Sequence, residues 1–394
     1  MGRNCARACA ARRTPGTRAH TRRPASGVSW GARDGTHGGS GKTTSPRCSR
    51  RPARSLTTPS RSSSRFWPNG CARRARRWVG KVIVALAAVA LLLAVAEPAW
   101  AWGPGTHVYL GLGLLDALHL VPAAVRDVVA LYPFDFLYGS VAADISMAKK
   151  YVPEGRHCHF WHVGEEVYER ATSDRLRAMA LGYLSHLAAD VVAHNLFVPR
   201  QMVLAARRAL GHTYWETRLD LALGPTYVAL TRYVVTEMDH SEADALLDRV
   251  LSATVFSFRT NRRIFRGLIR AQDSDRWHTV FGSLARSPRW GLPPALRHQY
   301  LALAFDAIVD YLRHRQASTT AREDPTGERA LATAKQLRRL LAREGAHRRP
   351  RLVRELADSF FPVPSRTEGA WEKRRIGPSR HLLAAVGGAT LRWG

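Results

Sequence analysis

Cysteine is scarce in this chain of 394 residues, which has only five. Four of them lie within the first 71 residues: Cys5, Cys9, Cys48 and Cys71. Only Cys158 remains beyond them, so residues 102–394 cannot form an internal disulfide. Stability there must come from a hydrophobic core, which a segment of that length can build.

Acidic residues are almost absent from the first 101 positions, which hold Asp34 and Glu97 against 20 basic residues. Residues 1–72 are rich in Arg, Ser, Pro, Thr and Gly and have almost no aliphatic periodicity, so we expect a disordered basic leader or upstream extension. A basic arm for nucleic acid is the alternative. The rest of the chain has 40 basic and 29 acidic residues, a net charge of +11.

Long hydrophobic runs are also few, and the clearest, from Val82 to Ala96, has 15 residues, fewer than the ~20 of a membrane-spanning helix. A basic stretch at 73–77 precedes it, and the small-x-small sequence Ala99-Trp100-Ala101 follows it. This order is typical of a bacterial secretory signal. We therefore predict a signal peptide over 73–101, cleaved after Ala101, and a periplasmic or extracellular protein. An uncleaved membrane anchor is the alternative.

Convincing strand patterns are missing after residue 102, whereas apolar residues recur at helical spacing. The pattern predicts an all-α bundle of many helices. Helices are expected at 175–192 and near 200–210, 212–236, 241–256, 260–271 and 295–315. We assign the catalytic domain to 102–315. Residues 316–394 form a basic appendage with one helix at 328–343. Its arginines are interpreted as a solvated face, with anionic lipid or polynucleotide as alternative partners.

Histidine is concentrated in one region, because eight of the fourteen histidines after residue 101 lie between positions 107 and 212. His186, Asp190 and His194 follow one another at intervals of four, which places them on one helix face. His212 and Glu216 form a second pair at the same interval. Helical proteins build metal sites from such pairs on facing helices, and neutral imidazole with carboxylate suits zinc.

Further motifs complete an ordered set over residues 102–220. Trp102-Gly103-Pro104-Gly105-Thr106-His107 begins it, Gly139-Ser140-Val141-Ala142-Ala143-Asp144 follows, and His159-Phe160 precedes the two helical pairs. The set resembles the zinc-dependent phospholipase C family, which includes bacterial phospholipase C and the catalytic part of glycosylphosphatidylinositol-specific phospholipase D. That family is related to the single-strand-specific zinc nucleases.

The resemblance implies three zinc ions and a set of ligands in this chain. These are Trp102, His107, His159, His186, Asp190, His194, His212 and Glu216. Signal cleavage would free the α-amino group of Trp102, which would chelate zinc together with its carbonyl oxygen. Asp190 would bridge two ions, and His194, His212 and Glu216 would hold the third.

Some roles stay open at the level of sequence. His157 and His162 are alternatives to His159, and Asp220 is either a second layer of the site or a partner of a cation such as Arg218. The spacing from Trp102 to His107 resembles the nucleases, whereas the spacing from Asp190 to His194 resembles the phospholipase D branch.

The predicted function is phospholipase C-type hydrolysis of phospholipid, in which a zinc-activated water attacks phosphorus and Asp144 orients or deprotonates that water. Activity should fall below about pH 6 as histidines protonate. One alternative is a nuclease that uses the same ions, with Trp161, Tyr214 and Trp215 either stacking on bases or lining a lipid cleft. Another is a metal-stabilised envelope protein without turnover. No obligate protein partner is inferred.

Overall fold

The computed structural model describes residues 102–147, 149–205, 212–274, 277, 279, 292–365, 369–375, 379 and 382–384. All of them belong to one unit of the chain, Asn69–Gly394. The predicted leader, 1–72, and the predicted signal peptide, 73–101, lie outside the described residues.

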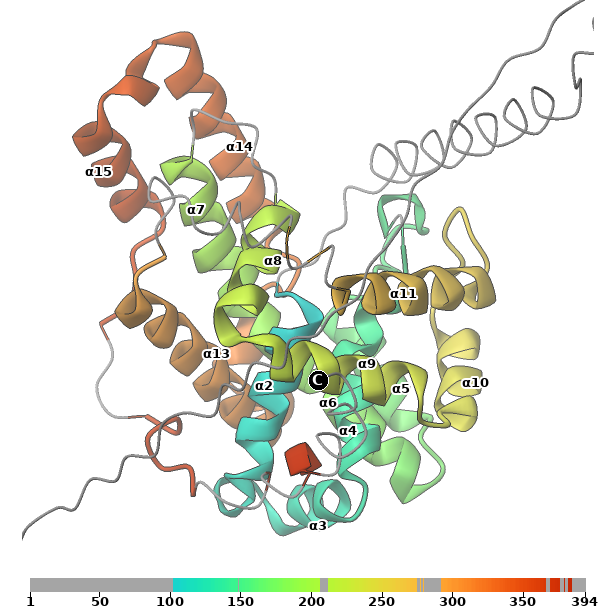
Figure 1. Ribbon diagram of the computed structural model, residues 1–394. Coiled ribbons are helices and arrows are strands. Elements are labelled where there is room, and N and C mark those ends of the chain that lie inside the picture. Colours follow the sequence, from blue (N-terminus) through green and yellow to red (C-terminus); the bar gives the residue numbers. More distant parts are fainter. Residues whose placement is uncertain are drawn as a thin grey trace, which may run out of the picture. The chain divides into compact units, whose positions relative to one another are not determined.

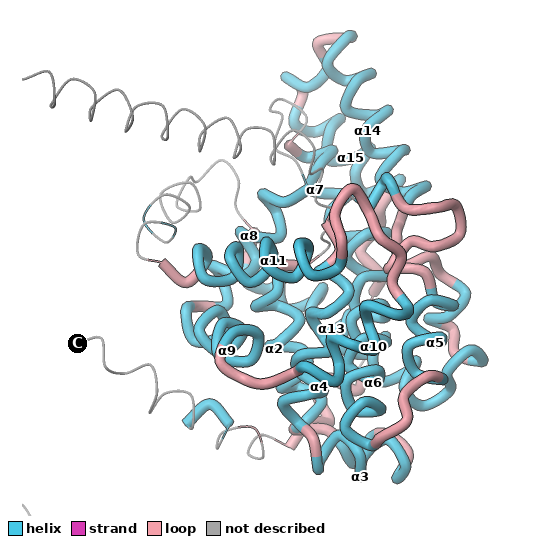
Figure 2. Tube along the Cα trace, turned by 90° about the vertical axis from the view of Figure 1, so that its right-hand side faces the viewer, coloured by secondary structure: helices cyan, strands magenta, loops and turns pink. Residues whose placement is uncertain are grey.

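The described part of the chain is helical and contains no strand, which confirms the all-α prediction (Figures 1 and 2). Its first helices are α2 (Pro104–Leu115), α3 (Ala123–Leu131), α4 (Pro133–Ala142), α5 (Trp161–Glu169), α6 (Asp174–Val192) and α7 (Val198–Leu204). Then follow α8 (His212–Leu223), α9 (Pro225–Thr236), α10 (Ser241–Val250), α11 (Phe258–Gln272), α13 (Pro294–His314), α14 (Glu328–Arg343) and α15 (Pro350–Phe360). Shorter turns include η2 (Ala143–Ile145), η3 (Lys149–Tyr151) and the π-helical turn η4 (Ala193–Phe197).

Helix α6 is the centre of the bundle, since α4, α5 and α13 all pack against it. Two glycines bring α4 and α6 unusually close. A Cβ at Gly139 would lie 1.9 Å from the carbonyl oxygen of Met179, and a Cβ at Gly182 would lie 2.0 Å from that of Phe136. The absence of side chains at these positions therefore sets the distance between the two helices.

Two predicted helices, 212–236 and 241–256, are wrong in their extent. The span 212–236 is divided into two helices, α8 and α9. Gly224 interrupts it with a φ of 103°, a value that does not occur within an α-helix, and Pro225 begins α9. Proline lacks the N–H that a continuous helix would need at this position, and glycine tolerates the positive φ. Similarly, the helix expected at 241–256 ends at Val250. The predictions for 175–192 and 328–343 agree with α6 and α14.

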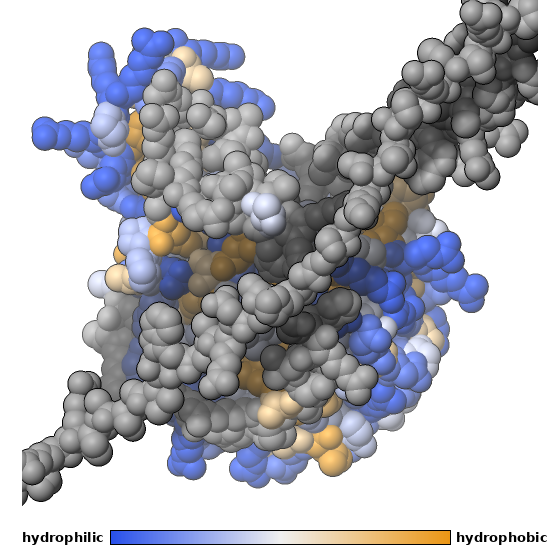
Figure 3. All heavy atoms as spheres, viewed as in Figure 1, coloured by the Kyte–Doolittle hydropathy of each residue, from blue (hydrophilic) through white to orange (hydrophobic). Residues whose placement is uncertain are grey.

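The C-terminal helices contact the same bundle. Helix α13 packs along α6, whereas α14 and α15 pack on α7, and α14 also contacts η4. Figure 3, in the same view as Figure 1, shows hydrophilic side chains projecting where α14 and α15 lie. The domain boundary expected at 315 stays a prediction.

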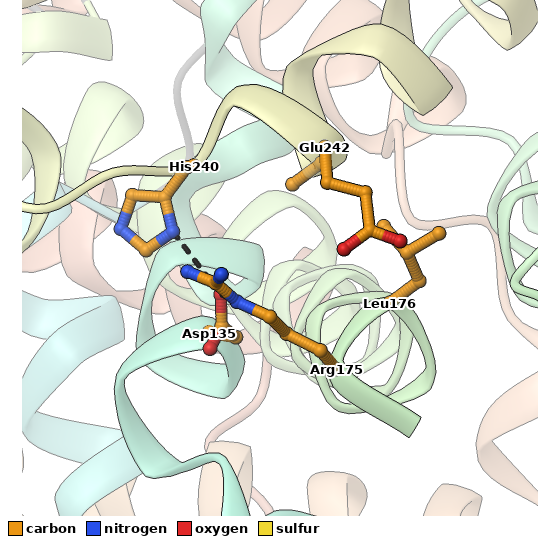
Figure 4. Close-up of a pocket in the computed structure, with 6 residues that line it drawn as sticks. Asp135, Arg175, Leu176, His240 and Glu242 are labelled. Atoms are coloured by element: carbon orange, nitrogen blue, oxygen red, sulfur yellow. Dashed lines mark hydrogen bonds and ion pairs between the residues drawn. The ribbon is translucent and has the colours of Figure 1, made fainter. Parts of the chain in front are cut away.

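A polar cluster joins α4, α6 and the turn before α10 (Figure 4). Arg175 donates a hydrogen bond to Asp135 at 2.9 Å, and His240 Nδ1 lies 3.3 Å from the same carboxylate oxygen. His240 also stacks on Tyr138, with ring centroids 3.9 Å apart. These contacts tie helices together outside the histidine cluster.

Within the described residues, no single helix is long and apolar enough to cross a membrane. One bent pair, Ala123–Leu131 with Pro133–Ile145 at 99°, satisfies that test by length and composition alone.

Candidate metal centre

Helix α6 presents two of the predicted ligands to the protein interior, His186 and Asp190, and both are fully buried. The Nδ1 atom of His186 lies 2.9 Å from the carbonyl oxygen of Ser140 on α4. Because a carbonyl only accepts, Nδ1 carries the proton and donates it. In the neutral imidazole, Nε2 then has a free lone pair, which is the form that binds metal.

Three ligand atoms converge on one point beside Asp190. Its Oδ2 atom lies 3.1 Å from His186 Nε2 and 3.1 Å from His159 Nε2. The two Nε2 atoms are 3.0 Å apart. Two ligands of one tetrahedral zinc are about 3.3 Å apart. The triangle therefore has the size of a zinc coordination face.

The other oxygen of Asp190 faces a different histidine. Oδ1 lies 3.3 Å from Nε2 of His107 on α2. The His107 ring stacks on the His186 ring, with centroids 3.8 Å apart, so the two imidazoles lie side by side. Asp190 thus directs one oxygen toward His107 and the other toward His159 and His186, an arrangement that would allow the carboxylate to bridge two ions.

Several buried polar atoms of the cluster lack a hydrogen-bond partner within the described residues. They are His107 Nε2, Asp144 Oδ2 and both carboxylate oxygens of Asp190. Buried polar atoms are normally paired, because leaving one unpaired costs roughly 1–3 kcal/mol. A divalent cation would satisfy all of them, and the donor set of imidazole and carboxylate fits zinc.

Asp144 lies on η2 at the edge of this cluster. Together with His107 and His186 it forms a group whose ligand atoms lie within 4.8 Å of one another, close enough to share an ion. Burial opposes ionisation, but Lys149 and the nearby histidines outweigh it and hold the pKa of Asp144 well below its usual value. The geometry therefore fits Asp144 as a ligand or as an orienting carboxylate better than as a strong base.

Lys149 is a member of the site that the sequence did not indicate. Its ammonium nitrogen lies 2.8 Å from Asp144 Oδ1 and 3.3 Å from His159 Nε2, and the side chain is buried. It supplies the positive charge that keeps Asp144 ionised. No spacing rule connects Lys149 to the histidine motifs, because tertiary folding alone brings it there.

Of the three candidate histidines near residue 160, His159 alone is fully buried in the cluster. The half-buried His157 accepts a hydrogen bond from the backbone N–H of His159, and the exposed His162 lies 2.6 Å from the carbonyl of Gly155. The preceding loop is held by Tyr183 of α6, whose hydroxyl donates to the carbonyl of Cys158 at 2.5 Å. This geometry favours His159 as the ligand.

The segment that begins at Trp102 is fixed against the site. The indole of Trp102 is buried, donates to the carbonyl of Ala189 at 2.9 Å and stacks on Phe197. Asp220 accepts hydrogen bonds from the N–H groups of Gly105 and Thr106 at 3.0 and 2.8 Å. It therefore caps the N-terminus of α2, where the helix dipole favours a carboxylate.

The predicted third zinc site is only partly within the described residues. His194 is buried on η4, and its Nδ1 donates to the carbonyl of Pro325 at 2.5 Å, which leaves Nε2 as the ligating atom. Burial, followed by repulsion from Asp144 and Asp190, raises the pKa of the buried Glu216 well above its usual value. His212 begins α8, but its side chain lies outside the described part. Their role as a zinc set stays a prediction.

A comparison with protein families identifies the region that holds these residues. Residues 106–256 match the family described as zinc dependent phospholipase C. This match supports the resemblance to zinc-dependent phospholipase C that the sequence motifs indicated. No curated protein and no solved structure matches the chain.

The matched segment includes every predicted zinc ligand except Trp102, which lies four positions before it. Family and cluster together support a zinc-dependent phosphodiester hydrolase with a phospholipid substrate. They leave the number of ions and the individual ligands as proposals.

Proposed function

We propose that this protein is an exported zinc-dependent phospholipase C that hydrolyses the bond between glycerol and the phosphorylated head group of a phospholipid. The observation that carries this proposal is the position of Asp190, whose two oxygens face His107 on one side and His159 with His186 on the other. That arrangement lies inside the segment matched by the family.

Zinc bound there would offset the negative charge of the phosphodiester and activate water for attack on phosphorus. The chain's own residues prepare this chemistry. Ser140 and Pro325 hold His186 and His194 in the tautomer that can ligate. Asp144, kept ionised by Lys149, can accept a hydrogen bond from the attacking water and orient it.

Export is part of the proposal. Trp102 is buried against α6, so the folded domain includes the first residue after the predicted cleavage site. Cleavage after Ala101 would place a free α-amino group at Trp102, next to the helix turn that carries Asp190. N-terminal sequencing of the exported protein should therefore begin at Trp102. A later start would contradict the terminal chelate.

The function is tested by incubating the purified protein with dispersed phosphatidylcholine and, separately, with single-stranded DNA. We expect diacylglycerol and phosphocholine as products, loss of activity with a zinc chelator, and recovery when zinc is added. Asp144→Asn should retain zinc and lose at least about 100-fold in kcat. Asp127→Asn, the same change at an exposed position of α3, is the control and should be unaffected.

The alternatives give different results in the same assay. Cleavage of the DNA without release of diacylglycerol would identify a nuclease. Trp161 and Trp215, proposed to stack on bases, already pack within the protein: Trp161 stacks on Tyr311, and Trp215 is buried. A purified protein with no zinc and no activity on either substrate would contradict both enzyme interpretations.

A further inference from the structure

The two helices α14 and α15 form a basic, amphipathic hairpin, which we define as Glu328–Phe360. Its buried apolar residues are Ala334, Leu337, Leu341, Val353 and Ala357, and both helices pack on α7. Over these residues the sequence has nine basic and four acidic side chains. One face of the hairpin therefore packs against the protein, and its other side chains carry a net positive charge.

A groove lies along α14 beside Phe360, the last residue of α15. It has a volume of about 420 Å³ and is lined by Thr333, Gln336, Leu337, Arg339, Leu340, Arg343 and Phe360. Leu340 is 54% exposed and Phe360 is 49% exposed. Of the five large hydrophobic side chains exposed in the described residues, these two share one groove. Arg339 and Arg343, both exposed, lie beside them.

We propose that this groove and its arginines form a surface that binds membranes containing anionic phospholipid. Arginine pairs with phosphate in a bidentate manner, and leucine and phenylalanine enter the boundary between head groups and acyl chains. Basic and apolar side chains that line the same surface are typical of interfacial helices. A polynucleotide would use the charge, but it would gain nothing from an exposed leucine, which offers no ring for base stacking.

The hairpin is connected directly to the proposed zinc centre, and in this respect the inference rests on the proposed function. The carbonyl of Pro325, just before α14, accepts the hydrogen bond of His194, and the carbonyl of Asp324 accepts one from Asn195 at 2.8 Å. Gly327, the N-cap of α14, has a φ of 57°, and a Cβ there would lie 2.4 Å from that of His194. Helix α14 therefore begins beside His194, one of the predicted ligands of the proposed zinc centre.

Leu340 is thirteen residues beyond Gly327, which corresponds to about 20 Å along the helix. The surface is thus too far from His194 to be a subsite for the scissile phosphate. It serves as an anchor that holds the enzyme on the lipid surface while the centre acts on a substrate molecule.

The test is sedimentation of the full protein with vesicles of phosphatidylcholine alone or mixed with phosphatidylglycerol. We expect binding to the mixed vesicles that weakens with added salt. The pair Arg339→Glu and Arg343→Glu should lower the partition coefficient at least about tenfold, since each basic residue near an anionic surface contributes about fivefold. The pair Leu340→Ser and Phe360→Ser should lower it about tenfold through lost apolar burial.

Two controls keep the result specific. Arg259→Glu with Arg263→Glu makes the same change of net charge on the exposed side of α11 and should leave most of the binding intact. Arg339→Lys with Arg343→Lys keeps the charge and should retain most of the wild-type binding to the mixed vesicles. Equal losses in the α11 and α14 variants would overturn the proposal, because binding would then follow net charge alone. So would unchanged binding in the groove variants, or binding of single-stranded DNA in place of vesicles.

Hydrolysis of a short-chain, monomeric phosphatidylcholine separates this proposal from the proposed function. The groove variants should hydrolyse it at the wild-type rate. Vesicle binding without any hydrolysis would contradict the proposed phospholipase C activity but support the proposed membrane-binding surface. Hydrolysis with vesicle binding that the groove variants do not change would support the enzyme and contradict the surface.

Discussion

At the scale of single residues, the position of Asp190 explains the cluster. Its depth in α6 removes it from water, which by itself would raise its pKa, but the surrounding imidazoles of His186, His107 and His159 hold its pKa well below the usual value. An ionised carboxylate among imidazole nitrogens is a donor set that suits a divalent cation.

His107 should titrate at an unusually low pH in the metal-free protein. Burial, and then repulsion from His186, lowers the pKa of His107 to about 4, compared with an unfolded value of 6.5. The unfolded chain then binds more protons than the folded chain below pH 6.5. The stability linked to His107 is therefore complete above pH 6.5 and is lost as the pH falls toward 4.

This effect can be isolated by comparing wild type with His107→Asn in the absence of metal. Between pH 7 and pH 5 the wild type should lose about 2 kcal/mol more in its free energy of unfolding than the variant, measured with urea. The comparison is needed because the raised pKa values of Asp220 and Glu216 act in the opposite direction. Parallel pH dependences for the two proteins would contradict a lowered pKa at His107.

The sequence located most of this site but not all of it. Spacing alone placed His186 and Asp190 on one helix face, because α-helical geometry is local and periodic. Lys149 could not be found in this way, since tertiary folding and not helical spacing brings it to Asp144. The choice between His157, His159 and His162 likewise required the fold, because a loop has no fixed side-chain direction.

At the scale of secondary structure, the contact between α4 and α6 positions the centre. The close approach at Gly139 and Gly182 lets the carbonyl of Ser140 reach Nδ1 of His186. Sequence patterns predicted α6 and α14 well, because their apolar positions are periodic over many turns. They failed at the α8–α9 break, where a single Gly-Pro step outweighed continuous periodicity.

A methyl group in this contact should be costly. Gly139→Ala must move backbone atoms of α6, so it should destabilise the protein by about 1–3 kcal/mol and weaken zinc binding about 10–100-fold by displacing the partner of His186. Gly267→Ala on α11 is the matched control, because nothing lies within 4 Å of its added Cβ. That variant should be neutral or more stable by about 0.5–1 kcal/mol.

Thermal unfolding and zinc titration of both variants provide the measurement. If Gly139→Ala and Gly267→Ala had the same stability and zinc affinity, the close helix contact would not be what positions His186.

At the scale of the whole molecule, the described helices combine a buried polar centre with a basic, partly apolar hairpin. The first explains how a chain with a single cysteine after its predicted signal can gain stability from metal binding as well as from its core. The second, in the proposed role, would hold the enzyme at a lipid surface. Contacts at Pro325 and Gly327 join the two, so the segment after residue 315 contributes to the arrangement of the centre.

The central claim is that Asp190 bridges two zinc ions. The most direct test is anomalous diffraction at the zinc edge from crystals of the exported, zinc-loaded protein. We predict one peak between Asp190 and His107, a second between Asp190, His159 and His186, and a third beside His194 and Glu216. The absence of zinc within about 2.5 Å of either oxygen of Asp190 would contradict the account.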